Sequence, residues 1–262
     1  MEKTKIEWTD ATWNPVTGCL HGCEYCYART MVNRFAMRGA KVGENVVGLV
    51  LDEKFKGGGG KVEPYPFGFT PTLHRYRLGI PERWEKPRTI FVCSMADLFG
   101  DWVPDEWIAE VFVACERAPQ HRYLFLTKNP DRYDALIDKG LLPEADNFWY
   151  GSTVTDINRD RLHWNRDAHT FMSCEPMLAP WNPAGPPPKA RERFPEWVIF
   201  GAETGNRAGK VKPEKAWIDN AVKQCRNMGA AVFMKDNLLP VMGEGNMLRE
   251  FPWGTEGKDG ET

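Results

Sequence analysis

The sequence predicts an α/β fold: a full or partial (βα) barrel of the TIM type, with about six or seven βα units. Short, continuously apolar runs recur along the chain, as is typical of parallel strands that are buried on both faces. Segments with helical spacing separate these runs, and the connections between them are short. Hydrophobic residues make up 42% of the 262 positions, so the chain can bury a sizeable core. A doubly wound open sheet is the competing architecture, but its dinucleotide-binding version has no support, because no Gly-x-Gly-x-x-Gly follows the first expected strand.

The expected elements alternate from the first strand onward. A first strand is expected at 13–18 and a first helix at 27–39, on either side of a loop that contains three cysteines. The segment 104–118 begins with Pro-Asp-Glu, a good helix start, and carries its apolar residues on one side. The later strands are expected at the apolar runs 88–93, 123–127, 148–154, 170–174, 197–201 and 230–234. The remaining helices are expected at 130–139, 158–168 and 213–228.

One stretch, between residues 40 and 87, breaks this alternation. It contains the glycine run Gly57–Gly60, four prolines and several aromatic residues that would want burial. We therefore expect an insertion of hairpins and loops within a single domain that spans residues 1–250. Residues 251–262 are expected to form a polar C-terminal tail.

The charge balance excludes a general binder of polyanions. The chain has 34 basic and 36 acidic side chains, a net charge of −2, so any basic patch must be local. No apolar run approaches the roughly 18 residues that a membrane span needs. The first eight residues also lack the apolar stretch of a signal peptide. A cytoplasmic location is expected.

Three of the seven cysteines lie within eight positions, in the pattern Cys19-x3-Cys23-x2-Cys26. The other four, which lie in apolar stretches where a buried thiol is expected, are Cys93, Cys115, Cys174 and Cys225. In a reducing compartment such a cluster indicates metal binding or catalysis before disulfides. Three thiolates do not complete a structural zinc site, whereas a 4Fe–4S cluster held by three keeps one iron open for a ligand. A zinc site completed by His21, His74 or a distant cysteine is the alternative.

Polar residues recur at the expected carboxyl ends of the strands, where βα barrels gather their chemistry. The residues at these ends are Ser94 and Asp97, Thr127 and Lys128, Ser152 and Thr153, Cys174 and Glu175, Ala202 and Glu203, and Lys235 and Asp236. Six such ends predict a polar pocket at one mouth of the barrel. Glu175 and Glu203 are candidate catalytic residues, through contact with a cofactor or a substrate amine, because an unpaired carboxylate is costly to bury. A structural ion pair with Lys128 or Lys235 is the alternative.

The cysteine motif, with Tyr25 immediately before its last cysteine and an expected strand before the loop, resembles the radical S-adenosylmethionine (SAM) superfamily. The resemblance implies that Cys19, Cys23 and Cys26 hold a 4Fe–4S cluster and that the amino and carboxylate groups of SAM chelate its open iron. It also implies that one electron cleaves SAM to methionine and a 5′-deoxyadenosyl radical, which takes a hydrogen atom from the substrate. A flavodoxin- or ferredoxin-like reductant would supply that electron.

The order of the strand ends, Ser-x-x-Asp, then Thr-Lys, then Ser-x-Val, is similar to the spore-photoproduct-lyase branch of that superfamily. By this resemblance Tyr25 and Asp97 would belong to the cofactor-binding residues, and Ser94 would contact the amino group of SAM. Lys128 would contact its carboxylate, and Ser152 its methionine or ribose part. The resemblance further implies that Cys93 returns a hydrogen atom to the product radical. The structural alternatives are a solvated lysine at position 128 and a buried, inert thiol at position 93.

The wider chain resembles the uncharacterised phage-associated three-Cys-motif proteins, which supply no substrate. This resemblance covers most of the chain and is carried by residues 6–19, 93–99, 125–128, 173–176, 201–205 and 249–252. A nucleobase or nucleic acid is the leading substrate class, because of the lyase-like strand ends and the phage-associated resemblance, and a peptide is second. The stretch 74–88 interleaves cations with aromatics, a pattern that fits a nucleic-acid backbone and fits a solvated helix face equally well. The alternative function is a zinc-binding, nucleic-acid-binding module without catalysis.

Overall fold

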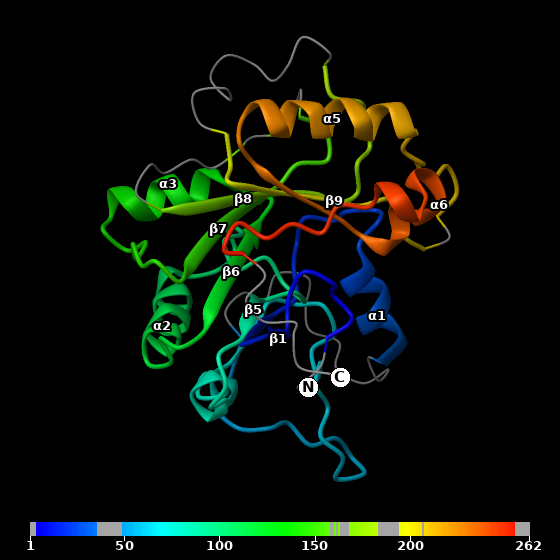
Figure 1. Cartoon of the computed structure of the whole chain (residues 1–262). Coiled ribbons are helices and arrows are strands. Elements are labelled where there is room, and N and C mark those ends of the chain that lie inside the picture. Colours follow the sequence, from blue (N-terminus) through cyan, green and yellow to red (C-terminus); the bar gives the residue numbers. More distant parts are fainter. Residues whose placement is uncertain are drawn as a thin grey trace. The chain divides into compact units, whose positions relative to one another are not determined.

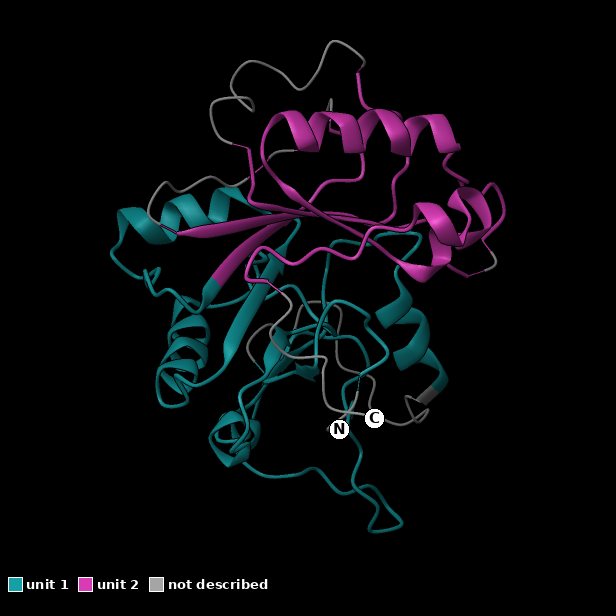
Figure 2. Cartoon of the chain, viewed as in Figure 1, with its two compact units in different colours: residues 1–148 teal, residues 149–262 magenta. Residues whose placement is uncertain are grey.

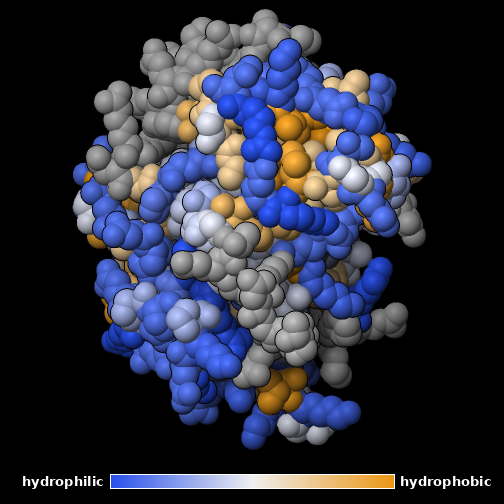
Figure 3. Space-filling view, viewed as in Figure 1, coloured by the Kyte–Doolittle hydropathy of each residue, from blue (hydrophilic) through white to orange (hydrophobic). Residues whose placement is uncertain are grey.

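The computed structural model describes residues 4–35, 49–157, 160, 162, 168–182, 194–205 and 207–254. Most of the helix expected at 158–168 lies outside these residues, as do positions 36–39 of the first helix and 40–48 of the expected insertion. Among the described residues, no helix has both the length and the apolar character that crossing a membrane requires. Hydrophilic residues predominate on the face of the described chain that Figure 3 shows.

Seven strands follow one another in the sheet order β1-β5-β6-β7-β8-β9-β10 (Figure 1). Their bounds are Ala11–Trp13 (β1), Thr89–Val92 (β5), Arg122–Thr127 (β6), Phe148–Thr153 (β7), His169–Cys174 (β8), Trp197–Phe200 (β9) and Ala231–Met234 (β10). The pairs β1–β5, β5–β6, β7–β8, β8–β9 and β9–β10 are all parallel. The strand order never reverses along the chain, as it would in a doubly wound sheet. The α/β class is thus confirmed, and the parallel sheet is compatible with the partial form of the predicted barrel.

The chain forms two compact units, residues 1–148 (unit 1) and 149–262 (unit 2), which Figure 2 distinguishes by colour. Unit 1 contains β1, β5 and β6. Its helices are α1 (Tyr27–Phe35), α2 (Asp105–Glu116) and α3 (Asp131–Asp138). Unit 2 contains most of β7, which begins at the boundary, and β8 to β10. Its helices are α5 (Lys215–Asn227) and α6 (Leu239–Met242). The expectation of one domain over 1–250 stays a prediction.

Aromatic side chains form much of the core of unit 1. Helix α2 follows Pro104, has two acidic residues in its first turn and buries an apolar face, as the 104–118 pattern predicts. From that face the Phe112 ring lies 5.2 Å from Phe125 in β6 and 6.0 Å from Phe148. Phe99, from the loop after β5, lies 4.4 Å from Tyr133 of α3. These contacts fix the loop after β5 between α2, α3 and the sheet.

The segment expected as the first strand, 13–18, is divided between two sheets. β1 ends at Trp13, and Val16–Thr17 (β2) pairs antiparallel with Thr72–His74 (β4) in a three-stranded sheet that also contains Leu49–Leu51 (β3). Pro15 lies between the two parts, and a proline cannot donate a hydrogen bond to a strand ladder. The prediction of one strand over 13–18 is therefore wrong, because Pro15 ends the first strand and the residues after it belong to another sheet.

The described part of the stretch 40–87 contains the strands β3 and β4, turns and 3-10 helices. Lys56 and Val62 form an antiparallel bridge around the glycine run, whose turn is closed by a hydrogen bond from Gly60 N to Gly57 O (2.9 Å). Two 3-10 helices, Arg75–Arg77 (η1) and Pro81–Arg83 (η2), follow β4.

In unit 2, helix α5 and the strands enclose a core that continues beyond residue 250. Two short 3-10 helices, Asp236–Leu238 (η3) and Glu244–Asn246 (η4), flank α6. The Phe251 ring lies 5.3 Å from Phe233, and Trp253 lies 5.1 Å from Trp197 in β9. Phe251 and Trp253 therefore pack against the core of unit 2, although they belong to the segment that was expected to form a polar tail.

Candidate functional site

The loop that carries the three cysteines (residues 18–26, the cysteine loop) is fixed to unit 1 where it begins. Gly18 has φ +89°, and a Cβ there would lie 2.4 Å from the Thr70 carbonyl oxygen, so only glycine fits. Its N–H donates to the Met95 carbonyl at 2.9 Å, and the Cys19 N–H donates to the Phe69 carbonyl at 3.2 Å. The backbone at Cys19 therefore has a defined position.

The loop ends at the N-terminus of α1, where Cys26 occupies the capping position. The Cys26 Sγ accepts a hydrogen bond from the Arg29 N–H at 3.3 Å, as a capping side chain does. The Arg29 guanidinium donates to the Cys19 carbonyl at 2.9 Å and so links the two ends of the motif. The positive end of a helix favours a thiolate, so this position suits Cys26 as a ligand.

All three thiols of the motif are half-buried and free of disulfide bonds. Burial raises the pKa of Cys19 to about 12, and Asp97, Cys23 and Cys26 add to the rise by electrostatic repulsion, against a backbone hydrogen bond that lowers it. Without a cation, Cys19 is therefore a protonated thiol at neutral pH. Among the described residues, no three His, Cys, Asp or Glu side chains are grouped closely enough to hold a single metal ion.

Three side chains of the cysteine loop and the adjoining turn of α1 contact three predicted cofactor-binding residues at the strand ends. His21 Nε2 lies 2.7 Å from the Asp97 Oδ2. The Lys128 Nζ lies over the Tyr25 ring, 5.3 Å from its centroid. The Tyr27 hydroxyl donates to the Ser94 carbonyl at 2.6 Å. Unit 1 thus brings Ser94, Asp97 and Lys128 together around the cysteine motif.

Asp97 is a buried carboxylate with four hydrogen-bond donors. Besides His21 at Oδ2, it accepts the Lys128 N–H at 2.9 Å, and its Oδ1 accepts the Thr127 hydroxyl at 2.7 Å and the Phe99 N–H at 3.1 Å. A carboxylate offers about four lone-pair positions, which these donors occupy. The geometry therefore favours a supporting role for Asp97 over the direct cofactor contact expected from sequence.

The chain turns sharply after β5 at Cys93. Its φ of +58° makes it the one residue other than glycine with a positive φ in the described chain. Asn14, which follows β1, holds this turn: its Oδ1 accepts the Ser94 hydroxyl at 3.2 Å and the Met95 N–H at 2.9 Å. Burial raises the pKa of Cys93 to about 12, so the thiol keeps the hydrogen that a hydrogen-atom donor needs. That role of Cys93 stays a prediction.

Unit 2 holds the other predicted residues, and an ion pair crosses the end of β9. Glu175 Oε1 and Lys235 Nζ, which follow β8 and β10, form this pair. A Cβ at Gly201, between them, would lie 3.1 Å from the Glu175 Cγ and 3.2 Å from the Lys235 Cδ, so glycine permits the approach. The alternative of a Glu175–Lys235 ion pair is confirmed. Ser152 is buried within β7.

Glu203 pairs with an arginine, so the expected lysine partner is wrong for this residue. The Arg207 guanidinium donates to both carboxylate oxygens, at 2.7 and 2.8 Å, and the Val211 N–H donates to Oε2 at 3.2 Å. Arg207 is only four residues away, in a loop whose course the sequence did not reveal. The hydrogen bonds from Arg207 hold the pKa of the Glu203 carboxyl below its usual range.

This pair predicts a pH-dependent contribution to stability. A carboxyl whose pKa is depressed by folding stabilises the protein above its unfolded pKa, about 4.3, and loses that contribution as pH falls through the folded pKa. We expect Arg207→Met to lower the free energy of unfolding by about 2 kcal/mol at pH 7 and by much less at pH 3. Urea titrations of both proteins at both pH values measure the difference. An equal loss at the two pH values would contradict the assignment.

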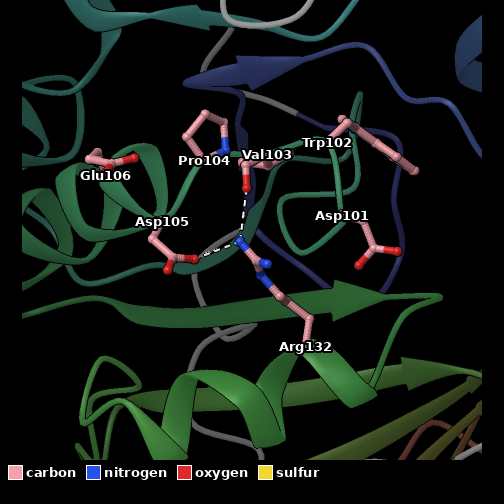
Figure 4. Close-up of a pocket in the computed structure, with 7 residues that line it drawn as sticks. All are labelled: Asp101, Trp102, Val103, Pro104, Asp105, Glu106 and Arg132. Atoms are coloured by element: carbon pink, nitrogen blue, oxygen red, sulfur yellow. Dashed lines mark hydrogen bonds and ion pairs between the residues drawn. The ribbon is translucent and has the colours of Figure 1, made fainter.

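An open depression of about 530 Å³ lies in unit 1, between the end of the loop after β5, the start of α2 and α3 (Figure 4). The residues that line it are Asp101, Trp102, Val103, Pro104, Asp105, Glu106 and Arg132. Arg132 extends from α3 toward the loop after β5 and donates to the Val103 carbonyl at 2.9 Å and to Asp105 at 2.6 Å. Trp102 also contacts the His21 ring, edge to face at 4.8 Å. Trp8 and Trp13, in contrast, are buried in the core of unit 1.

The basic stretch 74–88 is engaged in contacts within the protein. Arg75 forms ion pairs with Glu110 and Asp52, each at 2.8 Å. Arg77 donates to the Asn14 and Pro64 carbonyls, both at 3.0 Å. Two of the cations expected to follow a nucleic-acid backbone are thus held by the fold, and this stretch gives no support to a nucleic-acid substrate.

Sequence reasoning assigned no supporting role to several residues that build this site. His21 was considered only as a zinc ligand, and the sequence gives Asn14 and Trp102 no spacing that links them to the cysteines. Their one signal is position: Asn14 and Trp102 follow the first two strands of the parallel sheet, whose carboxyl ends meet at one edge.

A family model described as "Protein of unknown function (DUF5131)" matches residues 3–238. No curated protein matches the chain, and no solved structure does.

Proposed function

The chain belongs to the DUF5131 family, and we propose that it is a radical SAM enzyme with one 4Fe–4S cluster. One observation carries the proposal: His21, Tyr25 and Tyr27, in and beside the cysteine motif, contact Asp97, Lys128 and Ser94 at the strand ends. When bound, the cluster would supply the electron that cleaves SAM to methionine and a 5′-deoxyadenosyl radical.

The donor set of the cysteine loop fits a cluster better than a single metal ion. A structural zinc site takes four protein ligands, and the motif supplies three thiols. A 4Fe–4S cluster takes one thiolate for each iron, and three thiolates leave one iron open for a ligand. Cys19, Cys23 and Cys26 would hold three irons, and metal binding would displace the protons that these thiols carry.

Lys128 and Ser94 have the chemistry to bind the amino-acid part of SAM. Lys128 places a half-buried ammonium beside Tyr25, next to the last cysteine, where it can neutralise a carboxylate. The Ser94 hydroxyl donates its hydrogen to the Asn14 Oδ1. A hydroxyl oxygen that has donated keeps its acceptor positions, so Ser94 can accept a hydrogen bond from an amino group.

Metal analysis followed by SAM cleavage tests the proposal. We expect the anaerobically reconstituted chain to contain about four irons and four sulfides, and to form 5′-deoxyadenosine when SAM and dithionite are added. One zinc per chain, with no iron uptake and no SAM cleavage, would replace the proposal with a zinc-binding module.

A further inference from the structure

We propose that Asp97 is a positioning residue, which holds His21 and through it the cysteine loop against the ends of β5 and β6. Its purpose, to keep three thiols in place beside Ser94 and Lys128, rests on the proposed function. The contact between the loop and the strand ends does not depend on that function, so the two can be tested apart.

The position of His21 makes it the natural point of attachment. It lies between Cys19 and Cys23, in a stretch without helix or strand, so the fold does not fix these residues through secondary structure. Its Nε2 lies 2.7 Å from the Asp97 Oδ2, and the two side chains are only 22% and 6% exposed. A hydrogen bond to a carboxylate that is shielded from water is stronger than one at the surface.

Asp97 is held in turn by both strand ends. Its Oδ1 accepts the hydroxyl of Thr127, the last residue of β6, and its Oδ2 accepts the N–H of Lys128. The Phe99 N–H fixes the carboxylate from within the loop after β5. Because one rigid carboxylate joins these groups, the position of His21 relative to Lys128 is determined within hydrogen-bond tolerance.

Trp102 supports the His21 ring from another direction. The rings meet edge to face with their centroids 4.8 Å apart, a geometry that adds to the energy of burial. His21 therefore has a hydrogen-bond partner at Nε2 and a packing partner at its ring. A side chain held at both places keeps few rotamers, and the loop backbone on either side of it loses freedom as well.

The test measures how fast each cysteine of the metal-free full chain is alkylated by iodoacetamide, with peptide mass mapping to identify the site. We expect His21→Ala and Asp97→Asn each to increase the alkylation rate of Cys23 by about 10-fold. Cys19 is not used as the readout, because the Asp97 charge itself raises the pKa of that thiol. Asp97→Asn keeps the His21 side chain. Faster alkylation in this variant therefore cannot be explained by the space that His21→Ala opens beside the cysteine. The rate increase in the double variant should be smaller than the product of the two single increases, because both single variants lose the shared His21–Asp97 interaction.

Two further measurements distinguish a loss of loop positioning from a general loss of the folded structure. Cys115 and Cys225 are fully buried in the two units, so unchanged protection of both reports an intact fold. His21→Gln, whose amide nitrogen can donate near the place of Nε2, should restore slow alkylation. Unchanged rates in the single variants, or rate increases that multiply in the double variant, would overturn the proposal. A wild-type chain that binds no iron would overturn the proposed function and leave this result valid.

Discussion

Replacing Cys19, Cys23 and Cys26 together with alanine is expected to abolish iron binding and 5′-deoxyadenosine formation while the chain stays folded. Iron content should fall from about four per chain to near zero, and deoxyadenosine formation should fall at least about 100-fold. The thiols are half-buried and free, and they lie in a loop outside the strands and α1. Alanine there removes ligands without opening a cavity in the core. Iron analysis, product chromatography and circular dichroism measure the three quantities.

The matched control for the triple variant is a cysteine pair outside the loop. Cys115 and Cys225 are free, but they are buried in α2 and α5. Replacing both with alanine should lower stability, by about 1 kcal/mol each, and leave iron content unchanged. If the triple variant instead retains its iron, the cysteine motif is not the metal site.

Lys128→Met is expected to weaken SAM binding by about 10-fold or more, equivalent to about 1.4 kcal/mol. Methionine keeps much of the length and apolar character of the lysine stem but removes the charge that faces the loop. The effect should appear in KM or Kd for SAM more than in kcat, because the contact is present before and during the reaction. Equilibrium binding of SAM to the reconstituted protein, at two salt concentrations, measures the loss.

Lys139→Met provides the comparison for the charge change. Lys139 also belongs to unit 1, but its ammonium pairs with Asp105 at 2.6 Å and is about half exposed. It should lose a surface ion pair, worth less than about 1 kcal/mol, without altering SAM affinity. If Lys128→Met and Lys139→Met bind SAM as tightly as the wild type does, Lys128 lies outside the cofactor site.

The sequence predicts the fold well where a local pattern is sufficient. Continuous apolar runs locate β5 to β10 within one or two residues, because strands buried on both faces are mostly apolar. The prediction of the first strand is wrong because Pro15 divides the 13–18 run. Only the pairing partners, which lie far along the chain, show that Val16 belongs to another sheet.

By itself, the sequence determined that three thiols lie close together, since Cys19, Cys23 and Cys26 share one loop whatever the rest of the chain does. It also placed Ser94 and Lys128 at strand ends, because parallel strands bring their carboxyl ends to one edge. Only the tertiary structure decided which partners the charged groups take. Asp97 faces His21, Glu175 faces Lys235 and Glu203 faces Arg207. A buried charge is stable only with a partner, and which partner lies within reach depends on loop paths that no local pattern specifies.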